Sequence, residues 1–446
     1  MSDALRLPPR PNLEQYKQLA RDLQRACQSS DPGSIRQWAA RWAEALARLQ
    51  GLEIAPQARR EIDSEAERIE QRWHKFKNSK ERSARCTLAG AQLFVAREHG
   101  FASWPKFAKH LEALARSNSP ASNFEAAADA IAGGDLATLQ KLLGENRELV
   151  RARSTREHRS TLLHYVSANG VEDFRQRTPK NIVEITKILL DRGADVNAES
   201  DAYGGGSTTL GLAATSMHPE RAGVQIALLQ TLLDDGARID QPSAAGNAQS
   251  LVRGCLANGQ PQAAEFLASR GAPVDLEGAA GLGRLGLVKS YFDEYGVLKP
   301  PATKQQMESG FLCACGYGRK EVVAFLLERG VDPGLHNDGR QTGLHCAAYG
   351  AHVDVVKLLL QRGSPVDVKE EGFHATPLDV ALWVWGNSPD RVERERCYEV
   401  VALLAQAGAK LDPQQWYNPD DDRPGMLEKI RSDPRMLAAL RGEISS

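Results

Sequence analysis

Residues 338–368 read DGRQTGLHCAAYGAHVDVVKLLLQRGSPVDV, and they contain the parts of one helical packing unit. The pattern predicts a turn at Asp338, a short helix with small residues on its inner face, and a longer helix with Val355 and Leu359 on its apolar face. Gly363 is expected to end the second helix, because a residue without Cβ adopts the left-handed cap at little cost. A single helix pair cannot bury its apolar stripe alone, so the pattern predicts a stack of such pairs.

The same pattern recurs through most of the chain. A degenerate repeat at 278–296 and an opening repeat at 130–150 complete the series, which makes about eight repeats. Three segments, RSTLLHYVSANG, QTGLHCAAYG and ATPLDVALW, each retain part of a T-P-L-H-x-A motif. This motif and a period of about 33 residues resemble ankyrin repeats over residues 124–412, and the resemblance implies an all-α solenoid. The helix-ending glycines are Gly193, Gly236, Gly271, Gly330, Gly363 and Gly408.

Three regions are predicted along the chain. Residues 1–118 are expected to form a small helical domain, since apolar residues recur at helical spacing in 12–50 and 86–115. Residues 119–412 are expected to form the repeat array, and 413–446 a turn-rich linker followed by capping helices. This order resembles a group of bacterial ankyrin-repeat proteins with an N-terminal helical domain, and that resemblance implies no activity and no site residue for this chain.

Charge is unevenly distributed over the 446 residues. Residues 1–118 hold 21 Lys and Arg against 14 Asp and Glu, whereas the remaining residues hold 35 against 43. A basic domain ahead of an acidic array indicates either that the two dock on each other or that the basic domain faces nucleic acid. Seven scattered cysteines do not make a disulfide framework, and no segment is apolar enough for a signal peptide or a membrane span. We therefore expect a reduced, cytoplasmic protein without membrane contact.

Three polar insertions interrupt the repeats. Aligned on residues 338–368, the repeats gain eleven residues at 171–181, seven within 216–223 and eleven within 386–397. All three insertions fall between the first and second helix of a repeat, and in a stacked array these connectors emerge along one edge. The sequence therefore predicts a thickened rim, and insertions in repeat arrays often mark the binding face.

The first two insertions are neighbours and are rich in aromatic, His and Arg residues. We predict that they form a recognition surface or a small pocket, together with a glycine-rich finger at 201–209. One alternative is that the insertions are tolerated decoration, because lengthening a loop costs little free energy. Another is an enzyme or small-molecule binder, in which His and Tyr carry protons and Arg clamps an anion. The candidate residues are His164, Tyr165, Phe174, Arg175, Arg177, Tyr203, Thr208, His218, Glu220 and Arg221.

A second group of candidate residues lies at helix ends of the later repeats. Tyr317 and Arg319 end one first helix, and Trp383 and Trp385 lie just before the third insertion. Tyr, Trp and Arg are the anchors that protein interfaces favour. The alternative is that one of the two tryptophans packs beneath its own insertion.

No motif for reaction chemistry is present. The sequence lacks a GxxxxGK[ST] phosphate loop, a GxSxG elbow and an HExxH helix. Cys313 and Cys346 occupy the same position of successive repeats, where a small apolar residue is needed, so they are expected in the core rather than on a metal. The sequence therefore predicts no catalytic residue, no cofactor and no metal, and it favours a non-catalytic protein over an enzyme.

The basic segment 72–85 carries six cations and one Glu, with Trp73 and Phe76 interleaved. Cations and aromatics together are typical of nucleic-acid binding, but a solvated helix face or a dock for the acidic array is the favoured interpretation of so short a segment. Our leading hypothesis is an interaction module that binds a protein partner through the concave face and the thickened rim of the solenoid. A small-molecule ligand and a nucleic-acid partner are the alternatives.

Overall fold

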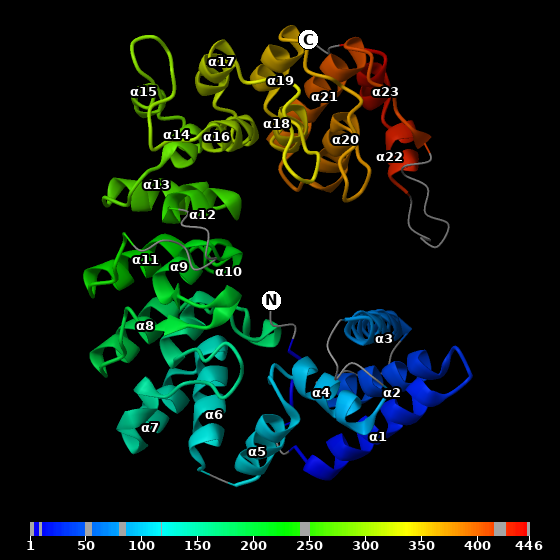
Figure 1. Ribbon diagram of the computed structural model, residues 1–446, viewed down its shortest axis with the longest axis vertical. Coiled ribbons are helices and arrows are strands. Elements are labelled where there is room, and N and C mark those ends of the chain that lie inside the picture. The colour runs from blue at the N-terminus through cyan, green and yellow to red at the C-terminus, as the bar shows by residue number, and fades with distance from the viewer. Residues whose placement is uncertain are drawn as a thin grey trace. The chain divides into compact units, whose positions relative to one another are not determined.

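The computed structural model describes residues 4–8, 11–49, 56–79, 86–116, 118–240, 250–413 and 425–443. Its internal contacts divide the chain into two compact parts, which we call the N-terminal half (Met1–Ala248) and the C-terminal half (Gln249–Ser446). Both halves are built from helices (Figure 1). The strands of the described residues are one two-residue pair, β1 (Glu199–Ser200) and β2 (Ser207–Thr208). The predicted all-α class is confirmed.

The N-terminal domain is a bundle around an aromatic core. The sequence predicted its helices in 12–50 and 86–115, and the structure adds a long helix between them, α3. Trp73 of α3 packs edge-on against Phe94 with ring centroids 5.1 Å apart, and Phe76 lies beside the same ring. Because Trp73 and Phe76 are buried, they are not available to stack on bases, which corrects that interpretation of the basic segment. The helices are α1 (Leu13–Gln28), α2 (Ser34–Leu49), α3 (Pro56–Lys77), α4 (Leu88–Glu98) and α5 (Trp104–Leu114).

A disulfide joins Cys27 to Cys86, so the expectation that every cysteine is reduced is wrong. The two residues are 59 positions apart in the sequence, and packing of α1 against α4 brings their Cα atoms to 5.6 Å. The predicted core role of Cys313 and Cys346 is met only in part, because both residues are half-buried and Cys346 packs against the edge of the apolar core. Burial raises the pKa of the Cys313 thiol to about 11 and that of Cys346 to about 12, which makes both thiols poor nucleophiles and metal ligands.

The repeats of the N-terminal half are three helix pairs with short additions. The first helix of the second pair is a 3-10 helix, and the predicted insertions form two further short helices. The pairs are α6 (Pro120–Gly133) with α7 (Leu136–Glu145), η2 (Leu162–Ser167) with α8 (Ile182–Asp191), and α9 (Thr209–Ala214) with α11 (Gln225–Asp234). The short elements are η1 (Arg147–Arg151), η3 (Asp173–Arg175), η4 (Ala202–Gly204) and α10 (Met217–Arg221).

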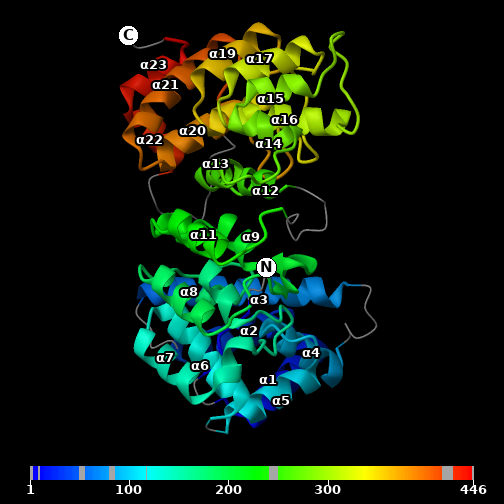
Figure 2. The same ribbon diagram turned by 90° about the vertical axis from the view of Figure 1, so that its left-hand side faces the viewer.

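The C-terminal half contains five further pairs in two layers (Figure 1). First helices pack on first helices, α14 on α16, α16 on α18 and α18 on α20, while α17 packs on α19 and α19 on α21. The last two helices, α22 (Met426–Ser432) and α23 (Pro434–Leu440), pack on α20 and α21 (Figures 1 and 2). The pairs are α12 (Leu251–Ala257) with α13 (Pro261–Ser269), α14 (Leu276–Leu282) with α15 (Leu285–Ser290), α16 (Lys304–Gly316) with α17 (Lys320–Glu328), α18 (Gly343–Tyr349) with α19 (Val353–Gln361), and α20 (Pro377–Asn387) with α21 (Arg391–Gln406).

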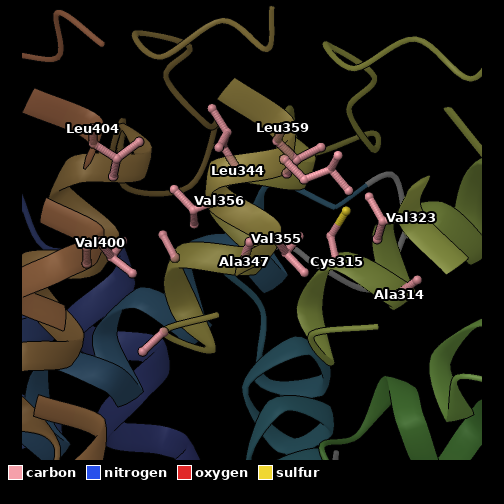
Figure 3. Packing of buried hydrophobic residues seen from close by; sticks show 14 of the residues in the cluster. Ala314, Cys315, Val323, Leu344, Ala347, Val355, Val356, Leu359, Val400 and Leu404 are labelled. Atoms are coloured by element: carbon pink, nitrogen blue, oxygen red, sulfur yellow. The ribbon is translucent and has the colours of Figure 1, made fainter. Parts of the chain in front are cut away.

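The described residues thus hold eight helix pairs, as the repeat pattern predicts. None of the described helices is long and apolar enough to cross a membrane. Figure 3 shows why the pairs stack: Cys315 of α16, Leu344 of α18 and Leu359 of α19 project into one continuous apolar layer. Each of these side chains is fully buried, so the layer supplies the burial that one pair cannot supply alone.

The third predicted insertion does not lengthen a connector. α20 and α21 have 11 and 16 residues, against 7 and 9 in α18 and α19, and these differences account for all eleven extra residues. Only residues 388–390 remain between the two helices. The expectation of a thickened loop is therefore wrong here, since Asp390 caps α21 and the charged run after it forms the first turns of that helix.

Close approach between first helices makes one glycine sensitive to substitution. A Cβ added to Gly281 of α14 would lie 2.5 Å from the Cys313 Sγ and 2.7 Å from the Leu256 Cδ1. We expect Gly281→Ala to destabilise the C-terminal half by about 1–3 kcal/mol, because the Cys313 and Leu256 side chains must shift to make room for the added methyl group. Gly286→Ala in α15 is the matched control, since its Cβ would meet nothing within 4 Å. Urea unfolding measures both, and equal stability of the two variants would contradict the prediction.

Candidate partner-binding surface

The first insertion is fastened to the array by buried charges. Glu172 is fully buried, and Arg156 and Arg175 are almost fully buried. Arg175 lies 2.9 Å from a Glu125 oxygen and 3.4 Å from a Glu172 oxygen, and its Nε donates to Asp129 at 2.8 Å. Arg156 pairs with Glu172 and donates to Glu125 at 3.0 Å. The insertion therefore closes a four-charge cluster (Glu125, Arg156, Glu172, Arg175) rather than standing free in solvent.

The two guanidinium groups keep both carboxylates of this cluster ionised. Burial by itself would raise the pKa of Glu172, but Arg175 and Arg156 outweigh burial and hold that pKa well below its usual range. Glu125 responds in the same way, and its pKa is lowered to about 2. Such a cluster is costly to break, because removal of one partner leaves an uncompensated charge inside the protein.

Three predicted recognition residues are structural, which corrects the prediction for them. Arg175 belongs to the charge cluster, and the buried Tyr165 hydroxyl donates to Glu172 at 3.2 Å. His164 is fully buried: its Nδ1 accepts from the Thr161 amide at 3.1 Å, and its Nε2 lies 3.1 Å from the Ser207 carbonyl oxygen. Burial lowers the pKa of His164 to about 4. None of these side chains is open to a partner or a substrate.

Phe174 and Arg177 lie on the outer side of the first insertion. The half-buried Phe174 ring is flanked by the guanidinium groups of Arg175, at 5.0 Å from its centroid, and of Arg6, at 5.8 Å. Arg177 is exposed. This side of the insertion therefore contacts the N-terminal segment of the chain.

The second insertion forms α10, and hydrogen bonds from the Gln225 side chain fix the backbone that leads into it. The buried Gln225 amide donates to the carbonyl oxygens of Ala213 and Ser216 at 3.1 and 3.0 Å. Partial burial and then Arg221 lower the pKa of His218, and Asp173 of the first insertion opposes that shift, which indicates that the two insertions are near each other. Glu220 and Arg221 are exposed.

The glycine-rich finger holds the remaining two residues of the first group. Tyr203 has a positive φ of 53° and is 45% exposed, and its hydroxyl donates to the Asn169 Oδ1 at 2.5 Å. Thr208 accepts from the Gly211 amide at 3.2 Å and so caps α9. Among the described residues, no group of His, Cys, Asp and Glu side chains is arranged to hold a metal ion.

The C-terminal half presents an exposed aromatic pair. Tyr349 at the end of α18 and Trp383 in α20 stack with ring centroids 6.3 Å apart and planes 13° from parallel. Tyr349 is 63% exposed and Trp383 48%. Tyr349 and Trp383 occupy equivalent positions of adjacent repeats. In the preceding repeat the equivalent residue is Gly316, which has no side chain to cover the Tyr349 ring.

The other candidates of the second group hold first helices together. Trp385 is mostly buried against Tyr398, with ring centroids 6.1 Å apart. The Tyr317 hydroxyl donates to the Leu256 carbonyl oxygen at 2.5 Å, and the Arg319 Nε donates to the Gly281 carbonyl oxygen at 2.9 Å. The sequence prediction included Trp383 but missed Tyr349. Alignment of the two repeats on Thr342 and Thr376, which cap their first helices, would have shown that Tyr349 and Trp383 are equivalent and adjacent.

The fold and these repeats define a class of protein, the ankyrin-repeat solenoids. Residues 311–415 match the family model described as "Ankyrin repeats (3 copies)". A fowlpox virus protein named for its ankyrin repeats is 27% identical over 121 residues, which are 22% of this chain and 28% of that protein. The human transient receptor potential cation channel subfamily A member 1 is 32% identical over 98 residues, which are 22% of this chain and 8% of the channel. The chain thus spans less than a third of the curated relatives it matches.

Two of the solved structures that match this chain are ankyrin repeat domains. The ankyrin repeat domain of human ASB11 is 21% identical, with 64% of this chain and 99% of that domain covered and a TM-score of 0.32. The Bcl-3 ankyrin repeat domain is 17% identical, with 57% and 92% covered and a TM-score of 0.30. A third match is a complex of a Bdellovibrio bacteriovorus predatory endopeptidase with an immunity protein, at 20% identity, 53% and 98% coverage and a TM-score of 0.31.

Proposed function

We propose that this protein is a non-catalytic interaction module that binds a protein partner through the Tyr349–Trp383 pair and the rim around it. The exposed stacked pair is the observation that carries the proposal. Ankyrin-repeat domains typically mediate protein–protein interaction. Large aromatic side chains dominate the binding energy of such interfaces, because they bury much apolar area at a small cost in side-chain entropy.

The surroundings of the pair support an interface. Tyr349 is the last residue of α18, beside the connector to α19, whereas Trp383 lies within α20, four residues before that helix ends. Partial burial lowers the pKa of His352 in the connector that follows Tyr349, and Arg396, Arg319 and Glu393 are close enough to His352 to act on that pKa. An aromatic centre within a charged rim is the usual composition of a protein interface.

The two alternative functions are less well supported. An enzyme built on the first insertions needs accessible proton carriers, but His164 and Tyr165 are buried in structural hydrogen bonds. Nucleic-acid binding by the segment 72–85 needs exposed aromatics, whereas Trp73 and Phe76 lie in the domain core. The interaction module remains the function that the exposed residues support best.

The test is capture of a partner by the full-length protein and its variants. We expect Tyr349→Ala and Trp383→Ala each to weaken binding of the captured partner by at least about 30-fold, or about 2 kcal/mol. Tyr295→Ala is the matched control: Tyr295 is 83% exposed, in a finger rather than at the pair, and its loss should leave affinity within about twofold. All three mutated residues are exposed, so thermal unfolding of the three variants should resemble that of the parent. A partner that binds the pair variants and the parent equally, or the absence of any enriched protein, would overturn the proposal.

A further inference from the structure

A groove of about 1140 Å³ separates α5 from the segment 153–159 in the N-terminal half. Its lining is strongly cationic, and its acidic members are Glu157 and Asp201. Asp201 is already engaged by Arg159 at 3.9 Å. The cationic residues of the lining are Lys106, Lys109, Arg116, Arg153, Arg156 and Arg159; of these, Arg156 is already paired with Glu125 and Glu172.

Each wall of the groove carries its own cations. On one wall Lys106, Lys109 and Arg116 follow helical spacing along α5 and just beyond its end, so they form a single stripe. On the other wall Arg153 and Arg159 flank the segment, and both are exposed. Between the walls the lining includes alanines and Pro120, which offer an apolar floor.

The walls are held together by buried contacts, so the groove exists before any ligand arrives. Arg156 donates to the His99 carbonyl oxygen at 2.6 Å, and the Glu157 amide donates to the Gly100 carbonyl oxygen at 3.0 Å. The Thr155 hydroxyl lies 2.8 Å from the Nδ1 of the buried His110. These contacts dock the N-terminal domain on the first repeats, and a preformed site loses less entropy when a ligand binds.

From this geometry we propose that the groove binds an acidic polypeptide segment of a partner protein. Carboxylates of the segment would pair with the two cationic walls, while its aliphatic atoms would lie on the alanine and proline floor. The groove exceeds the roughly 300–1,000 Å³ of ordinary small-molecule pockets, which favours a chain over a single small anion.

The distribution of the other cations favours a polypeptide over nucleic acid. Elsewhere in the described N-terminal domain several arginines are paired internally: Arg59 lies 2.7 Å from Glu44, and Arg72 lies 2.8 Å from Glu98. Part of the positive charge of this domain is therefore already neutralised by its own carboxylates. The groove lining also contains no Phe, Tyr or Trp ring for bases to stack on.

This inference concerns a different half of the chain from the aromatic pair and stands independently of the proposed function. The test measures binding of the full-length protein to a short fluorescein-labelled peptide of alternating glutamate and alanine. We expect saturable binding that weakens as salt is added, and no binding of the matching lysine–alanine peptide. The double variant Lys106→Glu/Lys109→Glu should bind the acidic peptide at least about tenfold more weakly.

The control is Lys141→Glu/Lys187→Glu, which makes the same charge change at two exposed lysines outside the groove. It should change affinity by less than about threefold, and thermal unfolding should show that both variants fold. Equal losses in the two double variants, or no binding of the acidic peptide by the parent, would overturn the proposal. Tighter, Lys106-dependent binding of a single-stranded or duplex oligonucleotide would assign the groove to nucleic acid instead.

Discussion

Replacement of Glu172 by glutamine is expected to destabilise the N-terminal half by about 3–5 kcal/mol. The substitution preserves the size of the side chain but removes the charge that lies between Arg156 and Arg175. Arg156 then has Glu125 as its remaining carboxylate, and Arg175 has Glu125 and the half-exposed Asp129, in a site from which water is largely excluded. The loss is large because a buried charge without its partner cannot recover its hydration.

Hydrogen exchange resolved by peptide fragments measures this prediction. Exchange should accelerate in α6, which carries Glu125, and in the first insertion, and remain unchanged in α16 to α19 of the other half. Asp173→Asn is the matched control, since it is the same chemical change at the next, exposed residue and should cost no more than about 0.5 kcal/mol. Equal effects of the two substitutions would show that the cluster contributes little.

Acidification from about pH 7 to pH 5 is expected to lower the free energy of unfolding of the N-terminal half by several kcal/mol. Each buried histidine contributes up to about 2 kcal/mol of this loss. Burial lowers the pKa of His99 to about 3 and those of His110 and His164 to about 4. In the unfolded chain each imidazole returns to a pKa of about 6.5. The unfolded state therefore binds protons first, so stability falls once the pH drops below about 6.5.

The N-terminal half is expected to lose further stability at lower pH. Glu125 and Glu172 have folded pKa values below the unfolded value of about 4.3, so their stabilisation is present above that pH and disappears as the pH approaches about 2. Urea unfolding at a series of pH values, followed by hydrogen exchange in the N-terminal half, checks both stages. His164→Asn should reduce the pH slope by up to one proton. A slope near zero between pH 7 and 5 would contradict the prediction.

The fold followed from local signals that each repeat carries in its own sequence. Gly363 ends α19 with a φ of 81°, as its place after an apolar stripe predicted, and the same holds for Gly408 after α21. Thr342 and His345 form a cap within one repeat, with the His345 Nδ1 accepting from the Thr342 amide at 3.1 Å. These features depend on neighbours within one repeat, so a single sequence contains them.

The site residues depend on contacts between distant segments, and there the sequence was a weaker guide. Arg175 resembles a surface residue of a polar loop until Glu125, fifty positions earlier, is known to face it. The Cys27–Cys86 pair depends in the same way on the packing of two separate helices. Trp383 was correctly chosen as a candidate anchor of a binding surface, but its exposure and its stacking on Tyr349 appear only once adjacent repeats are aligned in space.

The extra length of α21 limits where an additional repeat can be added to this protein. Its added first turns provide Glu395, which binds Arg435 of α23 through two contacts of 2.6 and 3.1 Å, and Tyr398 donates to Asp433 at 2.7 Å. The terminal helices thus occupy the face on which a ninth repeat would have to stack. An extra repeat could consequently be inserted at an interior junction, such as that between α17 and α18. A repeat added directly after α21 would first have to displace α22 and α23.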